Sequence, residues 1–261
     1  MSTARAAPEP DPPARHRSTA DTIGQGWRAA DPEGDADRHR RKGYPRAGRR
    51  PTVPSTIVHC ALAGLLAAGL LGEAFDARAV AVVLAATIVP DFDAFAGFLI
   101  PGGHRSVLHT LLLPLGAAAL LYADTRLRDR SFVRERWRER GIRVAWVSIA
   151  AIAFAAIGLD MTAGGVNLLY PIHDQFYALS GELVLSNDRG VVQTFVELGG
   201  GESEAVRGPT DQVHINSGVD RTPGAEPKDV ERVFPVAQSG WQLLLIVTSV
   251  FVLGARLWTD R

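Results

Sequence analysis

The sequence predicts an all-α, polytopic membrane protein with about five transmembrane helices. Three observations predict it: apolar residues gather in long blocks, polar stretches separate the blocks, and several blocks lack the polar stripe expected of a long helix in a soluble bundle. A helix needs about 20 mostly apolar residues to cross the hydrocarbon core of a bilayer. The blocks near this length are 56–73, 79–100, 107–123, 143–163 and 240–258.

The segment before the first block, residues 1–52, is rich in Pro, Ala, Gly, Asp and Arg and has almost no large aliphatic side chains. Such a segment cannot bury enough apolar surface to offset the entropy that ordering costs. It also lacks the apolar stretch that follows a short basic start in a signal peptide. We therefore expect residues 1–52 to be a disordered N-terminal extension.

The composition of the apolar blocks favours helices that pack closely in lipid. Ala and Gly are frequent beside Leu, and small side chains let transmembrane helices approach one another. Trp241 and Trp258 lie near the two ends of the last block, as interfacial aromatic residues do. The predicted organisation is a membrane-embedded core over 53–185, a hydrophilic and largely flexible segment over 186–238, and a C-terminal transmembrane helix over 239–261.

Charge is distributed unevenly along the chain, although Lys+Arg and Asp+Glu are both 28. The loop 124–140 carries seven arginines against four acidic residues, whereas 164–238 carries eleven acidic residues against five basic ones. Because short basic loops stay in the cytoplasm, this pattern places the first loop inside and the second segment outside. Residues 38–50, with seven basic residues and no acidic one, oppose that orientation. Either the native chain starts near Val53, so that 1–52 is a mis-annotated extension, or the orientation is inverted.

Several classes of protein are excluded by what the sequence lacks. A single cysteine, Cys60, rules out an internal disulfide and a cysteine-rich zinc site. There is no glycine-rich phosphate loop, dinucleotide fingerprint or nucleic-acid motif. The arginine runs flank apolar blocks, so contact with the bilayer explains them and no nucleic-acid partner is expected. The expected partner is the lipid bilayer, and the sequence leaves the oligomeric state open.

Ionisable residues interrupt the first four apolar blocks, and all of them are expected at one membrane face. Successive spans alternate in direction, so the starts of the first and third blocks meet the ends of the second and fourth. An intramembrane charge costs roughly 2.5–3.5 kcal/mol on insertion scales, so such residues should pair, line a cavity or bind a ligand. In chain order they are His59, Asp91, Asp93, His104, Arg105, His109 and Asp160.

Two kinds of cation explain why these groups lie together. Asp91 and Asp93 repel each other unless a cation lies near them, and imidazole with carboxylate is a ligand set that Zn²⁺, Mn²⁺ and Fe²⁺ accept. A proton held in a relay is the other candidate. Taken singly, the residues also fit ordinary interhelical hydrogen bonds, or a solvated helix end where Pro90 interrupts the second block. The residue types alone leave the metal site and the proton pathway open, although their placement on one side favours a surface site.

Four motifs follow one another in a fixed order: His59, then PDFD at 90–93, HRSVLHT at 104–110 and AIGLDMTAGGVNLLYPI at 156–172. In this order they resemble the YdjM-type family of membrane-bound proteins, which are classed as metal-dependent hydrolases. The resemblance covers about 54–185, half the chain. The continuation from His173 and the acidic outer segment look similar to haloarchaeal members, which suggests an archaeal cell membrane.

The resemblance implies a site for one or two divalent metal ions, with zinc as the first choice and manganese as the second. It also implies hydrolysis of an ester or phosphoester, with a membrane lipid as the natural substrate. Arg105 and Asp93 are the implied catalytic residues, and Arg105 would stabilise developing negative charge. The alternative is a non-enzymatic membrane protein, either an ion or proton pathway or a structural factor. The implied metal ligands are His59, Asp91, Asp93, His104, His109 and Asp160.

Two positions depart from the family pattern. Ala156 lies four residues before Asp160, where the family has a histidine. Thr162 follows Asp160 by two residues, whereas the pattern has three. His173 is the candidate to supply the missing imidazole.

Overall fold

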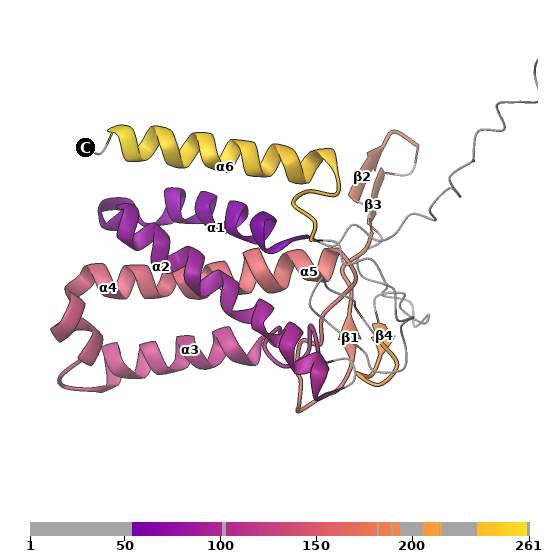
Figure 1. Cartoon of the computed structure of the whole chain (residues 1–261), viewed down its shortest axis with the longest axis horizontal. Helices are drawn as coiled ribbons and strands as arrows, with labels where there is room; N and C mark the ends of the chain where they lie inside the picture. The colour runs from indigo at the N-terminus through magenta and orange to yellow at the C-terminus, as the bar shows by residue number, and fades with distance from the viewer. Residues whose placement is uncertain are drawn as a thin grey trace, which may run out of the picture. The chain divides into compact units, whose positions relative to one another are not determined.

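A computed structural model shows a mostly helical chain, with four short strands among the residues that it describes (Figure 1). All the parts that it describes belong to one compact unit, Arg49–Arg261. The predicted disorder of 1–52 lies outside the described residues, and so does most of 186–238, which was expected to be largely flexible. The described residues are 54–100, 103–181, 183–188, 190–193, 206–213, 215 and 234–259.

Three helices among the described residues are long and apolar enough to cross a membrane: Ala77–Ala96, Phe132–Thr162 and Gly240–Thr259. They cover the second, fourth and fifth predicted blocks. The first block forms a shorter helix, α1 (Thr56–Leu70), and the third forms α3 (Leu112–Tyr122). The structure thus has three full-length helices and two shorter ones where five spans were predicted.

The third block begins as turns because its backbone donors bond elsewhere. The amide of Leu111 donates to the carbonyl of Leu168 at 2.8 Å, and the amide of Leu108 donates to Asp93 Oδ2 at 3.3 Å. A helix would need those donors for its own ladder. Arg105 and His109 were expected to share a helical face, but they lie instead in the turns that precede α3.

The helices run back and forth, as the spacing of the blocks predicts (Figure 1). Helix α2 continues without a break into a 3₁₀ helix, and α4 continues through a π-helix into α5. Helix α6 packs beside α1. The segments are α2 (Ala77–Ile88), η2 (Val89–Phe98), η3 (Ala123–Leu127), α4 (Phe132–Ala151), η4 (Ile152–Gly158), α5 (Leu159–Thr162) and α6 (Gly240–Thr259), with the short turn η1 (Gly72–Ala74) between α1 and α2.

Small residues make the core of this bundle. Buried alanines such as Ala63, Ala67 and Ala151 pack with Leu71, so the helix axes can approach closely. At Gly64 an added Cβ would lie 2.8 Å from both Leu253 Cδ1 and Ser249 Oγ of α6. The glycine is therefore required for the close contact between α1 and α6.

The change from α2 to η2 follows from Pro90, which has no N–H to donate to an α-helical ladder. Residues 89–98 take up three residues per turn, so every third side chain falls in one row. Long 3₁₀ segments are uncommon and often mark functional positions. This segment positions Asp91 and Asp93.

Four short strands were not predicted from the sequence. Strand β1 (Phe176–Tyr177) pairs antiparallel with β4 (Val206–Gly208), and β2 (Leu183–Ser186) pairs antiparallel with β3 (Gly190–Gln193). They lie at the same end of the bundle as η2 and α5 (Figure 1). This end therefore carries both the predicted polar residues and the strands.

Candidate metal centre

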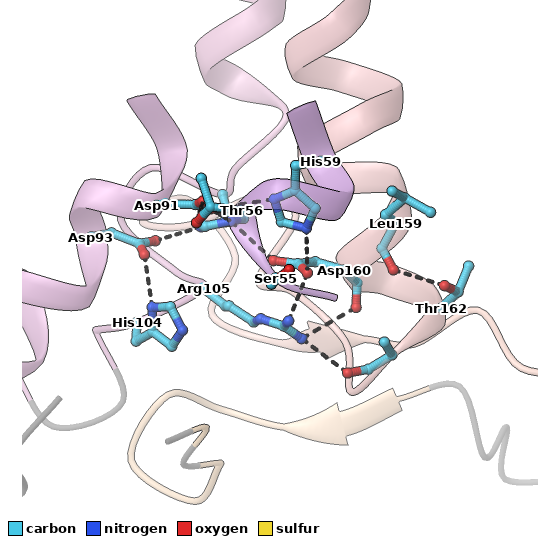
Figure 2. A network of polar contacts seen from close by, with 12 residues as sticks. Ser55, Thr56, His59, Asp91, Asp93, His104, Arg105, Leu159, Asp160 and Thr162 are labelled. Atoms are coloured by element: carbon cyan, nitrogen blue, oxygen red, sulfur yellow. Dashed lines mark hydrogen bonds and ion pairs between the residues drawn. The ribbon is translucent and has the colours of Figure 1, made fainter. Parts of the chain in front are cut away.

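The structure brings the predicted ionisable side chains together at one end of the bundle (Figure 2). His59 comes from α1, the two aspartates of PDFD from η2, and Asp160 from α5. The remaining three come from the turns before α3. All of them are buried except Asp91, which is half-buried: the exposed fraction is 0% for His109, 1% for Asp93 and Arg105, 2% for His59 and Asp160, and 9% for His104.

Three of these residues form a set that could hold a metal ion. Asp91, His109 and Asp160 each offer one ligand atom, and these atoms lie within 4.8 Å of one another. His109 Nε2 lies 3.5 Å from Asp91 Oδ1 and 3.1 Å from Asp160 Oδ2. This buried nitrogen nevertheless makes no hydrogen bond to the described residues, because proximity alone does not give the ring a suitable direction. An imidazole nitrogen between two carboxylates, without a hydrogen bond, fits a metal ligand.

His59 lies next to this set and faces both of its carboxylates (Figure 2). Its Nε2 is 3.2 Å from Asp160 Oδ1, and its Nδ1 is 3.5 Å from Asp91 Oδ1. Nδ1 is buried and, within the described chain, has no hydrogen-bond partner. His59 is therefore placed to complete the set or to orient Asp160.

Asp93 and His104 lie beside the three-residue set and are connected to it through His109. Asp93 Oδ2 is 2.8 Å from His109 Nδ1, and Asp93 Oδ1 is 3.0 Å from His104 Nδ1. The amide of Leu108 also donates to Asp93, at 3.3 Å. Metal-bound histidines commonly donate their second ring N–H to a carboxylate, which fixes the ring and its tautomer. Asp93 can do this for His109.

Arg105 is fixed against Asp160. Its guanidinium donates to Asp160 Oδ1 at 2.6 Å and to the carbonyl oxygen of Ala163 at 3.1 Å. Its backbone has φ 64°, an uncommon value for a residue with a side chain, and its carbonyl accepts from the Asn167 amide at 2.9 Å. With 1% of its surface exposed, the guanidinium is positioned to hold Asp160 in place.

Thr56 also touches the site, although the sequence analysis did not select it. Its hydroxyl donates to Asp91 Oδ2 at 2.5 Å. Thr56 lies three residues before His59 on α1, so the two side chains share one helical face. That spacing is a signal from which Thr56 could have been predicted.

Asn167 was missed as well, and no spacing in the sequence points to it. It is fully buried, and its side chain donates to Asp174 Oδ1 at 2.6 Å and to Thr210 Oγ1 at 3.0 Å. Burial acts to raise the pKa of Asp174, but hydrogen bonds from Thr210 and Asn167 outweigh it and lower that pKa. Because the Asn167 amide donates to the Arg105 carbonyl, these contacts connect Asp174 and Thr210 to the turn that holds Arg105.

The departures from the family pattern fall at the edge of the cluster. Ala156 is fully buried in the π-helix η4 and contributes only a methyl group. Thr162 is exposed, and its hydroxyl donates to the Leu159 carbonyl at 2.7 Å (Figure 2). His173 is exposed, and its ring lies 6.2 Å from that of Tyr177. His173 is therefore not among the residues that form the set.

The cluster carries more negative than positive charge when its imidazoles are neutral. With neutral imidazoles, the three carboxylates and the one guanidinium leave two negative charges on buried groups. A divalent cation balances them, and two protonated imidazoles balance them equally well. Buried charge is costly unless it is compensated, so a bound cation or bound protons must accompany these carboxylates.

Access to the cluster is set by Asp91. Its side chain is 20% exposed, whereas those of His109 and Asp160 are 0% and 2% exposed. A ligand from outside would therefore reach the set on the side of Asp91.

The fold and this cluster define a multi-pass helical membrane protein with a potential metal centre at one end. The chain matches the family described as YdjM inner membrane protein over residues 55–219, which is more than half of its length, and it belongs to that family. The match includes every residue of the cluster and supports a location in the cell membrane. No curated protein and no solved structure matches the chain. The suggested likeness to haloarchaeal members stays a prediction.

Proposed function

We propose that this protein is a membrane-bound, metal-dependent hydrolase that acts on an ester or phosphoester at one face of the membrane. One observation carries the proposal: His109 Nε2 is buried between the carboxylates of Asp91 and Asp160 without a hydrogen bond among the described residues. Membership of the YdjM family is consistent with it.

In this proposal Asp91, His109 and Asp160 hold a divalent ion, with His59 as the fourth group. A nitrogen and oxygen ligand set suits zinc, and manganese nearly as well. When bound, such an ion acidifies a water molecule and polarises the ester to be cleaved. The half-buried Asp91 leaves one side of the site open to substrate.

Asp93 and Arg105 act through other residues in this proposal. Asp93 holds the His109 ring through Nδ1, so that Nε2 faces the ion. Arg105 holds Asp160 from the opposite side and offsets part of its charge. Both are then positioning residues, and His104 supports Asp93.

We also propose that α1 and α3 cross the membrane beside the three long helices, which gives five spans. Helix α3 runs directly into η3, so the two together are longer than α3 alone. The basic segment 124–140 was expected to be a loop, but its residues from Phe132 onward form the start of α4. In this arrangement that basic segment lies inside and the site faces outside.

A second candidate function is a proton relay, and the continuous chain of contacts through the cluster favours it. Two protons on the imidazoles would neutralise the buried carboxylates as well as a divalent ion does. A chain of contacts also joins His104, Asp93, His109, Asp160 and His59. The two functions differ in whether the protein holds stoichiometric metal.

Metal analysis of the detergent-purified protein tests the proposal. We expect about one zinc or manganese ion per chain, and its loss in Asp91→Asn and His109→Gln because each removes one ligand. Asp188→Asn and His173→Gln are matched controls, since both residues are exposed and outside the set. The metal-loaded protein should then hydrolyse p-nitrophenyl acetate or p-nitrophenyl phosphate faster than either ligand variant.

Absence of metal from the wild type after loading with zinc and manganese would contradict the proposal and favour the relay. Equal metal content in the ligand variants and the controls would contradict the assignment of Asp91 and His109.

A further inference from the structure

One face of η2 is a row of exposed apolar side chains. Phe92, Phe95 and Phe98 are 56%, 52% and 46% exposed, and Val89, at the start of the same row, is 39% exposed. Neighbouring rings lie 6.4 Å and 6.3 Å apart between centroids. The row forms because a 3₁₀ helix has three residues per turn, which aligns every third side chain.

The other two rows of η2 face the protein. Asp93 follows Pro90 in one of them and is 1% exposed, and Ala94 follows Asp91 in the other and is 5% exposed. The same ten-residue element therefore directs its two carboxylates inward and its aromatic rings outward. Asp91, the most exposed member of the proposed set, directly precedes Phe92 of the row, so a molecule bound along the row lies beside the open side of the set.

We propose that this row, Val89, Phe92, Phe95 and Phe98, binds the acyl chain of a membrane lipid, which makes the substrate a lipid ester or phosphoester. The inference rests on the proposed hydrolase function. Three of the four members fall within the membrane-crossing helix Ala77–Ala96, so the bilayer brings acyl chains to them. Unpartnered phenylalanines are costly in water and favourable against a hydrocarbon chain.

The competing explanation for the exposed row is that it contacts bulk lipid and binds no substrate. Phe251 of α6 provides the matched control, because it is also an exposed phenylalanine in a membrane-crossing helix, with an exposed fraction of 74%. No contact among the described residues joins Phe251 to the cluster, whereas Phe92 follows Asp91 directly in the chain. If the row only contacts bulk lipid, substitutions in the row and at Phe251 should have the same effect on activity.

The first test compares long-chain and short-chain substrates with the metal-loaded protein in mixed micelles. For Phe92→Ser and Phe95→Ser we expect kcat/KM for p-nitrophenyl palmitate and dipalmitoyl phosphatidic acid to fall about tenfold, as for a lost apolar contact in a binding site. Values for p-nitrophenyl acetate and p-nitrophenyl phosphate should stay unchanged, and Phe251→Ser should change neither. Equal losses on long and short substrates, or no loss on either, would overturn the inference.

A second test does not depend on activity. A phosphatidylglycerol with a diazirine in one acyl chain is added below one molecule per protein, irradiated, and its attachment sites are located by mass spectrometry. We expect labelling to concentrate on 89–98 over 240–259 and to fall in Phe95→Ser. Even labelling of both helices would overturn the inference. Concentrated labelling without hydrolysis of any substrate would instead keep the lipid site and reject the hydrolase.

Discussion

The two ends of the helix bundle treat charged residues in opposite ways. At the site end, carboxylates, imidazoles and a guanidinium are buried and joined in one network. At the other end, the ion pairs are open to solvent. Arg140 and Asp76 form one pair with side chains 50% and 42% exposed, and Arg134 and Glu139 form another at 49% and 75%.

This difference separates a functional assembly from ordinary surface pairing. An exposed ion pair contributes about 0–1 kcal/mol, and many contribute nothing measurable. A buried network is often no more stable than an apolar replacement, yet removal of one member costs about 3–5 kcal/mol. A chain that keeps such a network in an alanine-rich bundle gains little stability from it, so its presence favours a ligand or a reaction.

Asp160→Asn should have the largest effect of any single substitution at the two ends. Asparagine keeps the volume of the side chain but removes the one carboxylate that Arg105, His59 and His109 all face. We expect a loss of about 3–5 kcal/mol in the free energy of unfolding, together with the loss of bound metal. Denaturant titration in mixed micelles, with metal analysis of the same sample, measures both.

Arg134→Ala, which breaks an exposed pair at the other end, is the control for Asp160→Asn. If both variants lose a similar amount of stability, the buried network and the exposed pairs do not differ in energy as argued above. If Asp160→Asn is destabilised but keeps its metal, Asp160 belongs to the structural network and not to the ligand set.

Asp93→Asn should have an intermediate effect that shows whether Asp93 binds the metal or orients a residue that does. Asparagine can still accept one hydrogen bond, but it loses the charge that faces His109 Nδ1 and His104 Nδ1. If Asp93 only orients His109, metal affinity should fall about 10–100-fold while the stoichiometry at saturation is kept. Titration with zinc in a competing chelator measures the affinity. Complete loss of metal, as expected for Asp91→Asn, would make Asp93 a ligand.

The placement of the candidate site could be predicted because it depends on alternation alone. His59 and Asp160 are 101 positions apart in the chain, yet apolar blocks of roughly membrane length bring their ends together at 3.2 Å between side-chain atoms. Membership of the YdjM family could be predicted from the ordered motifs, and the family match confirms it. The positions of the apolar blocks and the alternating direction of the helices are enough to predict which residues meet at one end of the bundle.

The division of roles within the cluster could not be predicted in this way. Asp91 and Asp93 look equivalent in PDFD, but the 3₁₀ geometry places them in different rows, so that Asp91 faces Nε2 of His109 and Asp93 faces Nδ1. The turns before α3 were expected to be helical, because an apolar block does not reveal that the Leu111 amide bonds to the Leu168 carbonyl. This error arises from a tertiary hydrogen bond, which local sequence patterns do not encode.

The smallest effect is expected at the opposite end of the bundle, for Arg140→Ala and Asp76→Asn. Arg140→Ala removes one exposed pair and should cost less than about 1 kcal/mol. Asp76 also caps α2 by accepting from the Ala79 amide at 2.7 Å, an interaction that asparagine can keep.

The hydrogen bond from the Ala79 amide is the main cause that lowers the pKa of Asp76 below its ordinary value of 3.8, and Arg140 adds to it against a small opposing effect of burial. A lowered pKa stabilises the folded state above pH 3.8, and this contribution is lost as the pH falls through the folded-state value. The stability difference between wild type and Asp76→Asn should therefore shrink below pH 3.8, as denaturant titrations at pH 3 and pH 7 would show. A difference that stayed constant with pH would mean that capping by either side chain, and not charge, determines the behaviour of this end.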